Sequence, residues 1–193
     1  MSSSAYSYCN EYPTELHNGQ AVAMAPSATV RHYSVSDNIA KILERHLRGK
    51  ACAVFKDSVD VILSDKDRFI PDVMVVCDSS KIKNGGVHGA PDLVVEVLSP
   101  STARRDKGYK KKLYEKHGVK EYWLVNTDSK SIEVHLLKDG KFEFDNDYAV
   151  HPEAFLRRMT AEERGRVITE FSPSIFPDLV ASLDDVFKSI FDD

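Results

Sequence analysis

One apolar segment with a single acid, Leu93–Leu98, constrains the fold of this chain most strongly. Its sequence, L-V-V-E-V-L, lacks the alternation of apolar and polar residues that a half-exposed strand shows, so the strand should be covered on both faces. An ionised Glu96 inside such a strand loses roughly several kcal/mol of hydration unless a cation or a hydrogen-bond donor offsets the loss. The segment therefore predicts a central strand with a charged group or a metal ion beside Glu96.

The residues after this strand predict a crossover to a second strand. A Ser-Pro-Ser-Thr turn ends the strand, a helix runs to Gly118, and another apolar segment follows at Glu121–Asn126. Gly is common just after a helix, and the order strand, helix, strand is that of a βαβ crossover. We therefore expect an α/β (mixed α+β) fold, with a mixed central sheet flanked by helices and extra hairpins.

Periodicity and turn residues predict the remaining elements. Asn18-Gly19 indicates a tight hairpin within Glu15–Met24, and apolar residues at helical spacing predict a helix over His32–Leu47. Asp57-Ser58 predicts a bulge or bend within a strand, and residues 78–89 are typical of a polar loop. The other expected elements are strands over Ala51–Leu63, Phe69–Cys77 and Ser131–Leu137, and helices over Thr160–Arg166 and Ser182–Phe191.

Length, charge and cysteine usage bound the class of protein. In a chain of 193 residues we expect one domain over residues 12–193 and a loose, disordered tail over residues 1–11. The N-terminus lacks the features of a signal peptide, and no apolar run could span a membrane, so we expect a cytoplasmic protein with no membrane partner. The cysteines, Cys9, Cys52 and Cys77, form no metal-ligand pattern, and we expect free thiols. A net charge of −4 leaves nucleic-acid binding to a local basic patch, bound cations or an oligomer.

Two acids and a lysine could form a metal-dependent site. Asp72 lies in a second apolar segment, and its carboxylate can approach Glu96 if the two strands pair. Two carboxylates in one dry place repel each other unless a cation binds. Mg²⁺ prefers oxygen ligands and often uses one or two carboxylates together with substrate phosphate, and Mn²⁺ can substitute for it. Taken singly, each acid would more often be a strand-end residue that meets water or an arginine.

A helical wheel separates one lysine of the crossover helix from its neighbours. At 100° per residue, Asp106, Lys110, Leu113 and His117 fall within a wedge of about 60°. Lys110 therefore shares the inner face, where its charge could stabilise a phosphodiester transition state. The alternative is that Lys110 extends past the core to water. Asp106, four residues earlier, can form a salt bridge that orients Lys110.

Several other polar residues carry weaker predictions. A basic strip on the outer half of this helix would ordinarily be a solvated face, but beside a nuclease site it could contact phosphates. His32, at the start of the first long helix, could support the site, although a helix-start or core histidine is the more common role. The residues expected to contact phosphate are Arg104, Arg105, Lys107 and Lys111.

The chain resembles the Uma-two family of restriction endonucleases. The resemblance rests on P-D-V-M-V-V-C-D (Pro71–Asp78), on A-P-D-L-V-V-E-V-L-S-P-S-T (Ala90–Thr102), and on the D-x-x-x-K-x-x-x-Y pattern that begins at Asp106. This family in turn resembles the PD-(D/E)XK nucleases, which implies a restriction-endonuclease-like core. By that resemblance Asp72 and Glu96 bind the metal.

The resemblance also implies a relocated lysine and two departures from the family pattern. The usual lysine place, two residues after the second acid, is occupied by Leu98, and the matching lysine is Lys110 on the next helix. Glu15 matches the family pattern, but Gln20 stands where relatives usually have an acid. Residues 145–172 match only weakly and suggest an insertion.

The resemblance and the residues together predict a metal-dependent endonuclease that hydrolyses DNA phosphodiester bonds. Asp72, Glu96 and Lys110 would be its catalytic residues, with Mg²⁺ as cofactor and Glu15, His32 and Asp106 in support. A homodimer is expected, because cutting two strands needs two sites. The alternative is a nuclease-fold nucleic-acid-binding or regulatory module with weak or no catalysis, which the acidic net charge and Gln20 favour.

Overall fold

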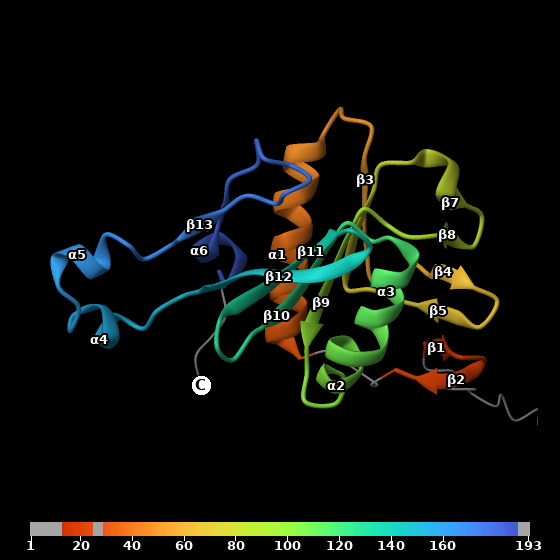
Figure 1. Cartoon of the computed structure of the whole chain (residues 1–193), viewed down its shortest axis with the longest axis horizontal. Coiled ribbons are helices and arrows are strands. Elements are labelled where there is room, and N and C mark those ends of the chain that lie inside the picture. Colours follow the sequence, from red (N-terminus) through yellow and green to blue (C-terminus); the bar gives the residue numbers. More distant parts are fainter. Residues whose placement is uncertain (1–12, 25–28, 189–193) are drawn as a thin grey trace, which may run out of the picture.

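The protein has a mixed α+β fold built on two large sheets. The computed structural model describes residues 13–24 and 29–188, so the expected tail lies outside them. Within these residues, one six-stranded sheet has the order β12-β11-β10-β9-β6-β3, and a second has the order β2-β1-β5-β4-β8-β7 (Figure 1). The first, here the central sheet, contains both parallel and antiparallel pairs. The predicted mixed α+β class is confirmed.

The central sheet places the apolar strand of Glu96 in its interior. This strand, β9, pairs in parallel with β10 and antiparallel with β6, with Val95 opposite Val73. The expected crossover between the two parallel strands is therefore present. The strands of this sheet are β3 (Ala53–Lys56), β6 (Val73–Val76), β9 (Leu93–Leu98), β10 (Glu121–Asn126), β11 (Ser131–Lys138) and β12 (Lys141–Ala149).

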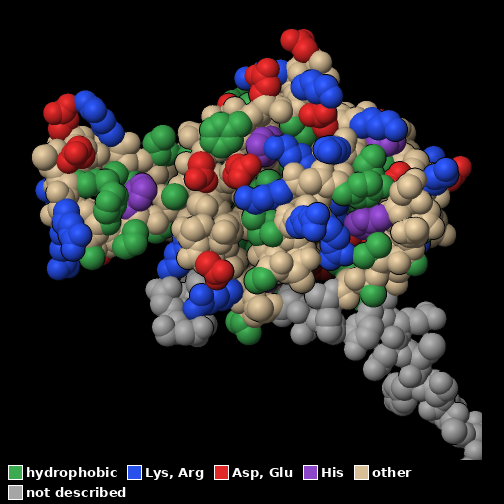
Figure 2. All heavy atoms as spheres, turned by 60° about the horizontal axis from the view of Figure 1, so that its bottom comes forward, with side chains coloured by type: hydrophobic (Ala, Val, Ile, Leu, Met, Phe, Trp, Pro, Cys, Tyr) green, Lys and Arg blue, Asp and Glu red, His purple; other side chains and the backbone are tan. Residues whose placement is uncertain are grey.

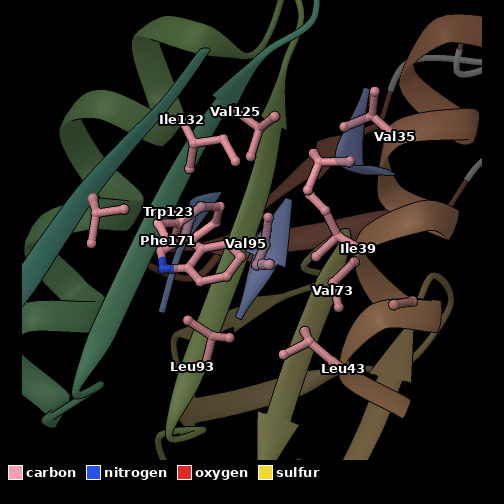
Figure 3. Packing of buried hydrophobic residues seen from close by; sticks show 14 of the residues in the cluster. Val35, Ile39, Leu43, Val73, Leu93, Val95, Trp123, Val125, Ile132 and Phe171 are labelled. Atoms are coloured by element: carbon pink, nitrogen blue, oxygen red, sulfur yellow. The ribbon is translucent and has the colours of Figure 1, made fainter. Parts of the chain in front are cut away.

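Helices and side chains cover both faces of the central sheet. On one face, α1 (Val30–Leu47) packs Val35, Ile39 and Leu43 toward Val73 (Figure 3). On the other face, a separate buried cluster joins the strands to the crossover helix and includes Met74, Val94, Tyr114, Tyr122 and Leu124. Because both faces are buried, β9 needs an apolar residue at almost every position.

The crossover helix is interrupted by a wider turn. It consists of α2 (Ala103–Arg105), a π-helical turn η2 (Asp106–Lys110) and α3 (Lys111–His117). Gly118, with φ of 90°, ends it in the left-handed conformation, as its sequence position predicts. Such π-helical turns are rare and are found frequently at functional sites.

The second sheet corrects two strand predictions. Ala51–Leu63 is two strands in different sheets, because Asp57 and Ser58 both take positive φ and turn the chain fully. Phe69–Cys77 is likewise broken, since Pro71 separates β5 from β6. The strands of this sheet are β1 (Thr14–His17), β2 (Gln20–Ala23), β4 (Val61–Ser64), β5 (Asp67–Phe69), β7 (Ile82–Lys83) and β8 (Gly86–His88).

Two segments expected to be turns or loops form hairpins. The Asn18-Gly19 hairpin is confirmed, with φ of 49° and 80° at the two residues. Residues 78–89, expected to be a polar loop, contain the 3-10 turn η1 (Ser79–Lys81) and the β7–β8 hairpin. Their backbone groups are therefore paired although the sequence is polar.

An arm leaves the body between β12 and β13. It comprises residues 152–169, including α4 (Glu153–Leu156) and α5 (Ala161–Arg164), and Figure 1 shows both helices to one side of the sheets. None of its side chains is buried. The chain returns through β13 (Glu170–Phe171), β14 (Ala181–Ser182) and α6 (Leu183–Val186). The helix predicted over Ser182–Phe191 is shorter where it is described, and residues 189–193 lie outside the described part.

A disulfide contradicts the expectation of free thiols. Cys52 and Cys77 are bonded, with 3.9 Å between their Cα atoms. They extend the β3–β6 ladder by one pair beyond Ala53 and Val76, so the sheet itself brings them together. Cys9 lies outside the described residues.

Across residues 13–24 and 29–188, every helix falls short of the length and apolar character that crossing a membrane requires.

Candidate nuclease site

A cleft of about 720 Å³ opens where the start of α1, the end of β9 and the start of α2 meet. Acidic and basic side chains line it together. The charged or ionisable residues on its wall are Glu15, Arg31, His32, Asp57, Asp72, Glu96, Arg105, Asp106, Lys110 and Asp128.

Asp72 and Glu96 are brought side by side by the pairing of β6 with β9. Asp72 immediately precedes β6, and its Oδ2 accepts a 2.6 Å hydrogen bond from the Val97 N–H on β9. Glu96 is only 3% exposed, yet it lines the cleft. The assumption that these two strands are neighbours, on which the predicted acid pair depended, is therefore confirmed.

Lys110 lies buried against these acids. It is 5% exposed, so the alternative in which it extends to water is wrong. Its Nζ lies 2.8 Å from Glu15 Oε1, 3.0 Å from Glu96 Oε1 and 3.5 Å from Asp106 Oδ1. Burial opposes the charge of Lys110, but the three carboxylates outweigh burial and raise its pKa above the ordinary value. The ammonium therefore stays charged.

The acids around Lys110 differ in their environment. At Glu15 burial favours the neutral acid, but Lys110 outweighs it and lowers the pKa. At Glu96 and Asp106, burial dominates and raises the pKa of each carboxyl group. One ammonium thus faces three buried carboxylates. At two of them, Glu96 and Asp106, the attraction of this single positive charge does not outweigh the effect of burial. Such an arrangement favours a further cation.

Asp106 also lacks a hydrogen-bond donor for one of its carboxylate oxygens. It is 1% exposed, and its Oδ1 atom is buried without a hydrogen-bond partner in the part of the chain that the structure describes. The 3.5 Å separation from Lys110 Nζ is an ion pair rather than a good hydrogen bond. Unsatisfied buried acceptors are rare in proteins, so the free acceptor of Asp106 marks this position as one that could bind a cation or a further donor.

His32 contacts Asp72 from the first turn of α1. Its Nε2 lies 3.3 Å from Asp72 Oδ2, and the helix begins at a Thr29 cap that accepts from the His32 N–H. Burial lowers the pKa of His32, but Asp72 outweighs burial and raises it. The predicted supporting histidine therefore lies at the site, on the outer side of Asp72.

Only part of the predicted basic strip reaches the cleft. Arg105 lines it, whereas Arg104 is exposed elsewhere. Lys107 pairs with Glu133 at 3.5 Å, and Lys111 Nζ contacts the ring nitrogens of His135 at 3.1 and 3.0 Å. Figure 2 shows Lys and Arg side chains gathered on one face with Asp and Glu beside them.

Several cleft residues were not predicted from the sequence. Arg31 lies one residue before the expected start of its helix, and the sequence predicts only a bulge or bend at Asp57. The turn Ser99–Thr102 also lines the cleft with hydroxyl groups that hydrogen-bond to one another. Its Ser and Thr content was the available signal. Gln20, which stands where the resemblance implies an acid, is exposed and is absent from the residues that line the cleft.

Curated relatives share sequence with most of the chain. It is 32% identical over 127 residues to "Uncharacterized protein slr1290" of Synechocystis sp., covering 65% of this chain and 66% of that protein. It is 26% identical over 117 residues to "Uncharacterized protein sll1609" of the same organism, covering 58% and 66%. The matched part thus spans just under two thirds of each relative.

A solved structure has the same fold. This is the crystal structure of "a putative nuclease belonging to DUF820" from Anabaena variabilis, with a TM-score of 0.64 and 19% sequence identity. The match covers 90% of this chain and 89% of that one. The predicted restriction-endonuclease-like core agrees with this likeness, which concerns the fold alone. Residues 5–146 also match the model of the Uma2 family, described as "Putative restriction endonuclease", and the chain belongs to this family.

Proposed function

We propose that this chain is a metal-dependent endonuclease that hydrolyses DNA phosphodiester bonds. The observation that carries the proposal is the meeting of Asp72, Glu96 and Lys110 at one cleft wall, from two paired strands and the crossover helix. Membership of a family described as restriction endonucleases supports nuclease chemistry in general. The dependence on a metal ion and the choice of DNA as substrate go beyond this general chemistry and are part of our proposal.

The residues present fit a divalent cation. Among the described residues there is no ready group of three or more His, Cys, Asp or Glu ligands. Mg²⁺ needs fewer from the protein, since it often binds one or two carboxylates and completes its shell with water and substrate phosphate. Asp72 and Glu96 would hold it, and the orphaned Oδ1 of Asp106 fits the same shortage of positive charge. When bound, the ion activates water and neutralises charge on the phosphate.

Lys110 acts as a fixed positive charge in this proposal. Because the surrounding carboxylates raise its pKa, its ammonium cannot serve as a proton acceptor near neutral pH. It can donate hydrogen bonds to the attacking water or to the oxygen atoms that gain charge in the transition state. Arg31 and Arg105 on the same wall could hold neighbouring phosphates. We also propose a homodimer, with one site for each DNA strand.

The experiment is a cleavage and metal-binding comparison of matched variants. Asp72→Asn, Glu96→Gln and Lys110→Met should each lower cleavage of plasmid DNA in Mg²⁺ or Mn²⁺ by at least about a hundredfold. Asp72→Asn and Glu96→Gln should also weaken Mn²⁺ binding, measured by electron paramagnetic resonance. Chelation with EDTA should stop cleavage, and added Mg²⁺ should restore it.

Asp92→Asn is the matched control. Asp92 is a buried aspartate that, like Asp72, accepts a backbone N–H, in its case from Cys77 at 2.7 Å, but it pairs with Lys120 outside the cleft. Its substitution should leave cleavage within about twofold of the wild type. Mn²⁺ binding without cleavage of single- or double-stranded DNA or RNA would instead favour the catalytically inactive binding module. Full activity in EDTA would contradict the metal site.

A further inference from the structure

Glu15 reaches the site from a different sheet than the two acids beside it. It belongs to β1 of the second sheet, whereas Asp72 and Glu96 belong to paired segments of the central sheet. Its side chain is nevertheless buried, at 2% exposure, and its Oε1 lies 2.8 Å from Lys110 Nζ. The hairpin β1–β2 is thus joined to the crossover helix by a buried ion pair.

The two oxygen atoms of Glu15 are both engaged by protein groups. Oε1 accepts from Lys110 and from the Ile70 N–H at 3.1 Å, and Oε2 contacts His17 Nε2 at 2.8 Å. Within the described residues, the contacts of Asp72 involve Oδ2 and those of Glu96 involve Oε1. Asp72 and Glu96 therefore each keep one oxygen that has no partner among the described residues, whereas both oxygens of Glu15 already have one.

The partners of Glu15 are themselves fixed by packing. The His17 ring stacks on Tyr109, with 5.2 Å between ring centroids, and meets the Phe69 ring edge-on at 5.0 Å. The Tyr109 hydroxyl donates to Asp67 at 2.6 Å. Because these groups hold the Glu15 carboxylate in place, that carboxylate can act as a rigid support for Lys110.

We infer that Glu15 is a positioning residue, which holds the Lys110 ammonium against Glu96 and makes hairpin β1–β2 part of the site. This inference rests on the proposed nuclease function, in which Lys110 is the charge-stabilising group. Without the charge of Glu15, the ammonium retains Glu96 and Asp106 as partners, at 3.0 and 3.5 Å, and can move toward Asp106. Such a shift takes it away from the place where the reaction needs it.

Kinetics in two backgrounds separate positioning from simple structural support. Glu15→Gln should lower the kcat of plasmid cleavage at least about tenfold in the wild type, with KM within about twofold. In the Lys110→Met background the same substitution should change the residual kcat by less than about twofold, because the positioned group is gone. An equal loss in both backgrounds would overturn the inference.

The affinity for Mn²⁺ shows whether Glu15 positions Lys110 or binds the metal itself. Glu15→Gln should leave the Kd for Mn²⁺ within about twofold of the wild type, while Glu96→Gln should weaken it at least about tenfold. A comparable weakening in Glu15→Gln would mean that Glu15 is a metal ligand and would overturn the inference. Glu121→Gln is the matched control. Glu121 is a buried glutamate bonded to Trp123 and Ser174, away from the cleft.

Urea unfolding provides a readout that requires no activity. Glu15→Gln should lower the urea midpoint in the wild type, because Lys110 loses a buried partner. In the Lys110→Met background the decrease should be less than half as large, whereas Glu121→Gln should lower the midpoint equally in both. Equal decreases for Glu15→Gln would overturn the inference. If the wild type cleaves no nucleic acid, the nuclease proposal fails, and the urea and Mn²⁺ series still decide the role of Glu15.

Discussion

At the scale of single residues, Tyr114 fixes the orientation of the Glu96 carboxylate. Its hydroxyl donates to Glu96 Oε1 at 3.0 Å, the same oxygen that Lys110 contacts. Burial raises the pKa of Tyr114 well above its ordinary value, so the phenol remains a neutral donor. Both donors on Oε1 come from the crossover helix, so the other oxygen of Glu96 is left for a different partner, which suits a ligand of a cation.

Removing this hydroxyl should destabilise the fold measurably. Tyr114→Phe leaves a buried carboxylate with one donor fewer, and we expect the free energy of unfolding to fall by about 1–2 kcal/mol. Urea unfolding followed by circular dichroism measures this. Tyr148→Phe is the control, because Tyr148 stacks on Phe171 at 4.7 Å and its hydroxyl makes no hydrogen bond among the described residues. Equal losses in both variants would show that the bond to Glu96 contributes nothing.

The residue pattern predicted the place of Lys110, and it put Tyr114 beside the same helix face without indicating that Tyr114 would bind Glu96. Asp106 and Lys110 lie four positions apart, so any helix with 3.6 to 4.4 residues per turn brings them to roughly one face. Glu96 was predictable because a lone acid in an apolar strand needs a partner. Tyr114 is a hydrophobic residue with a polar tip, and nothing in its own sequence context indicates which acid it would reach.

At the scale of elements, the π-helical turn η2 explains why Tyr114 is more buried than Leu113. At 100° per residue the inner face continues from Lys110 to Leu113, and Tyr114 only flanks it. The wider turn shifts the face by one position, so Tyr114 is fully buried and Leu113 is only half-buried. The spacing of apolar residues does not reveal such a wider turn. Leu113 and Tyr114 are adjacent and both largely apolar, so either of them could be the residue that faces the core.

The broken strands have a different cause. Both halves of Ala51–Leu63 are strand, as predicted, but the positive φ values at Asp57 and Ser58 send them to different sheets. An Asp-Ser pair is compatible with a bulge as well as with a full turn, so local sequence leaves the choice open. The choice depends on which strands are free to pair, and that is a property of the whole fold.

Glu115 should make the α3–β12 contact sensitive to pH. It accepts from the Phe142 N–H at 2.7 Å and from Lys141 at 2.9 Å, and these bonds lower its pKa below the ordinary 4.5. A lowered folded-state pKa stabilises the protein above the unfolded-state value, and this stabilisation is lost as pH falls. Glu115→Gln should therefore unfold at lower urea than the wild type near about pH 6, and the difference should shrink toward about pH 4.

A matched variant tests whether this pH dependence belongs to Glu115. Glu143 pairs with Lys138 at 3.4 Å on the same hairpin, and both side chains are more than half exposed. Glu143→Gln should show a much smaller difference from the wild type at either pH. A gap for Glu115→Gln that stays constant from about pH 6 to about pH 4 would contradict the prediction.

At the scale of the whole molecule, the candidate site lies at the junction of two sheets. Asp72, Glu96 and Lys110 could be predicted because strand, turn and helix signals are local. The buried pairing of Glu15 with Lys110 could not, since it joins β1 of the second sheet to the crossover helix, 95 residues further along the chain. Sequence patterns state which face of an element is buried, but not which other element covers it.

The disulfide should contribute to the stability of the whole chain. It closes a loop with a sequence separation of 25 residues, which restricts the unfolded chain and should stabilise the fold by about 2–4 kcal/mol. Dithiothreitol should therefore lower the urea midpoint of the wild type. The Cys52→Ala, Cys77→Ala double variant should unfold near the midpoint of the reduced protein and respond to dithiothreitol no further. An unchanged wild-type midpoint in reductant would contradict this.

Because of the arm of residues 152–169, the rotational friction of the molecule depends on the axis about which it turns. Its helices α4 and α5 project from one side of the sheets, and none of its side chains is buried (Figure 1). Such a projection is swept through solvent when the body turns end over end, but hardly at all when it spins about the axis of the arm. A single correlation time therefore cannot describe the tumbling of this protein, and backbone amides relax at rates that depend on their angle to that axis.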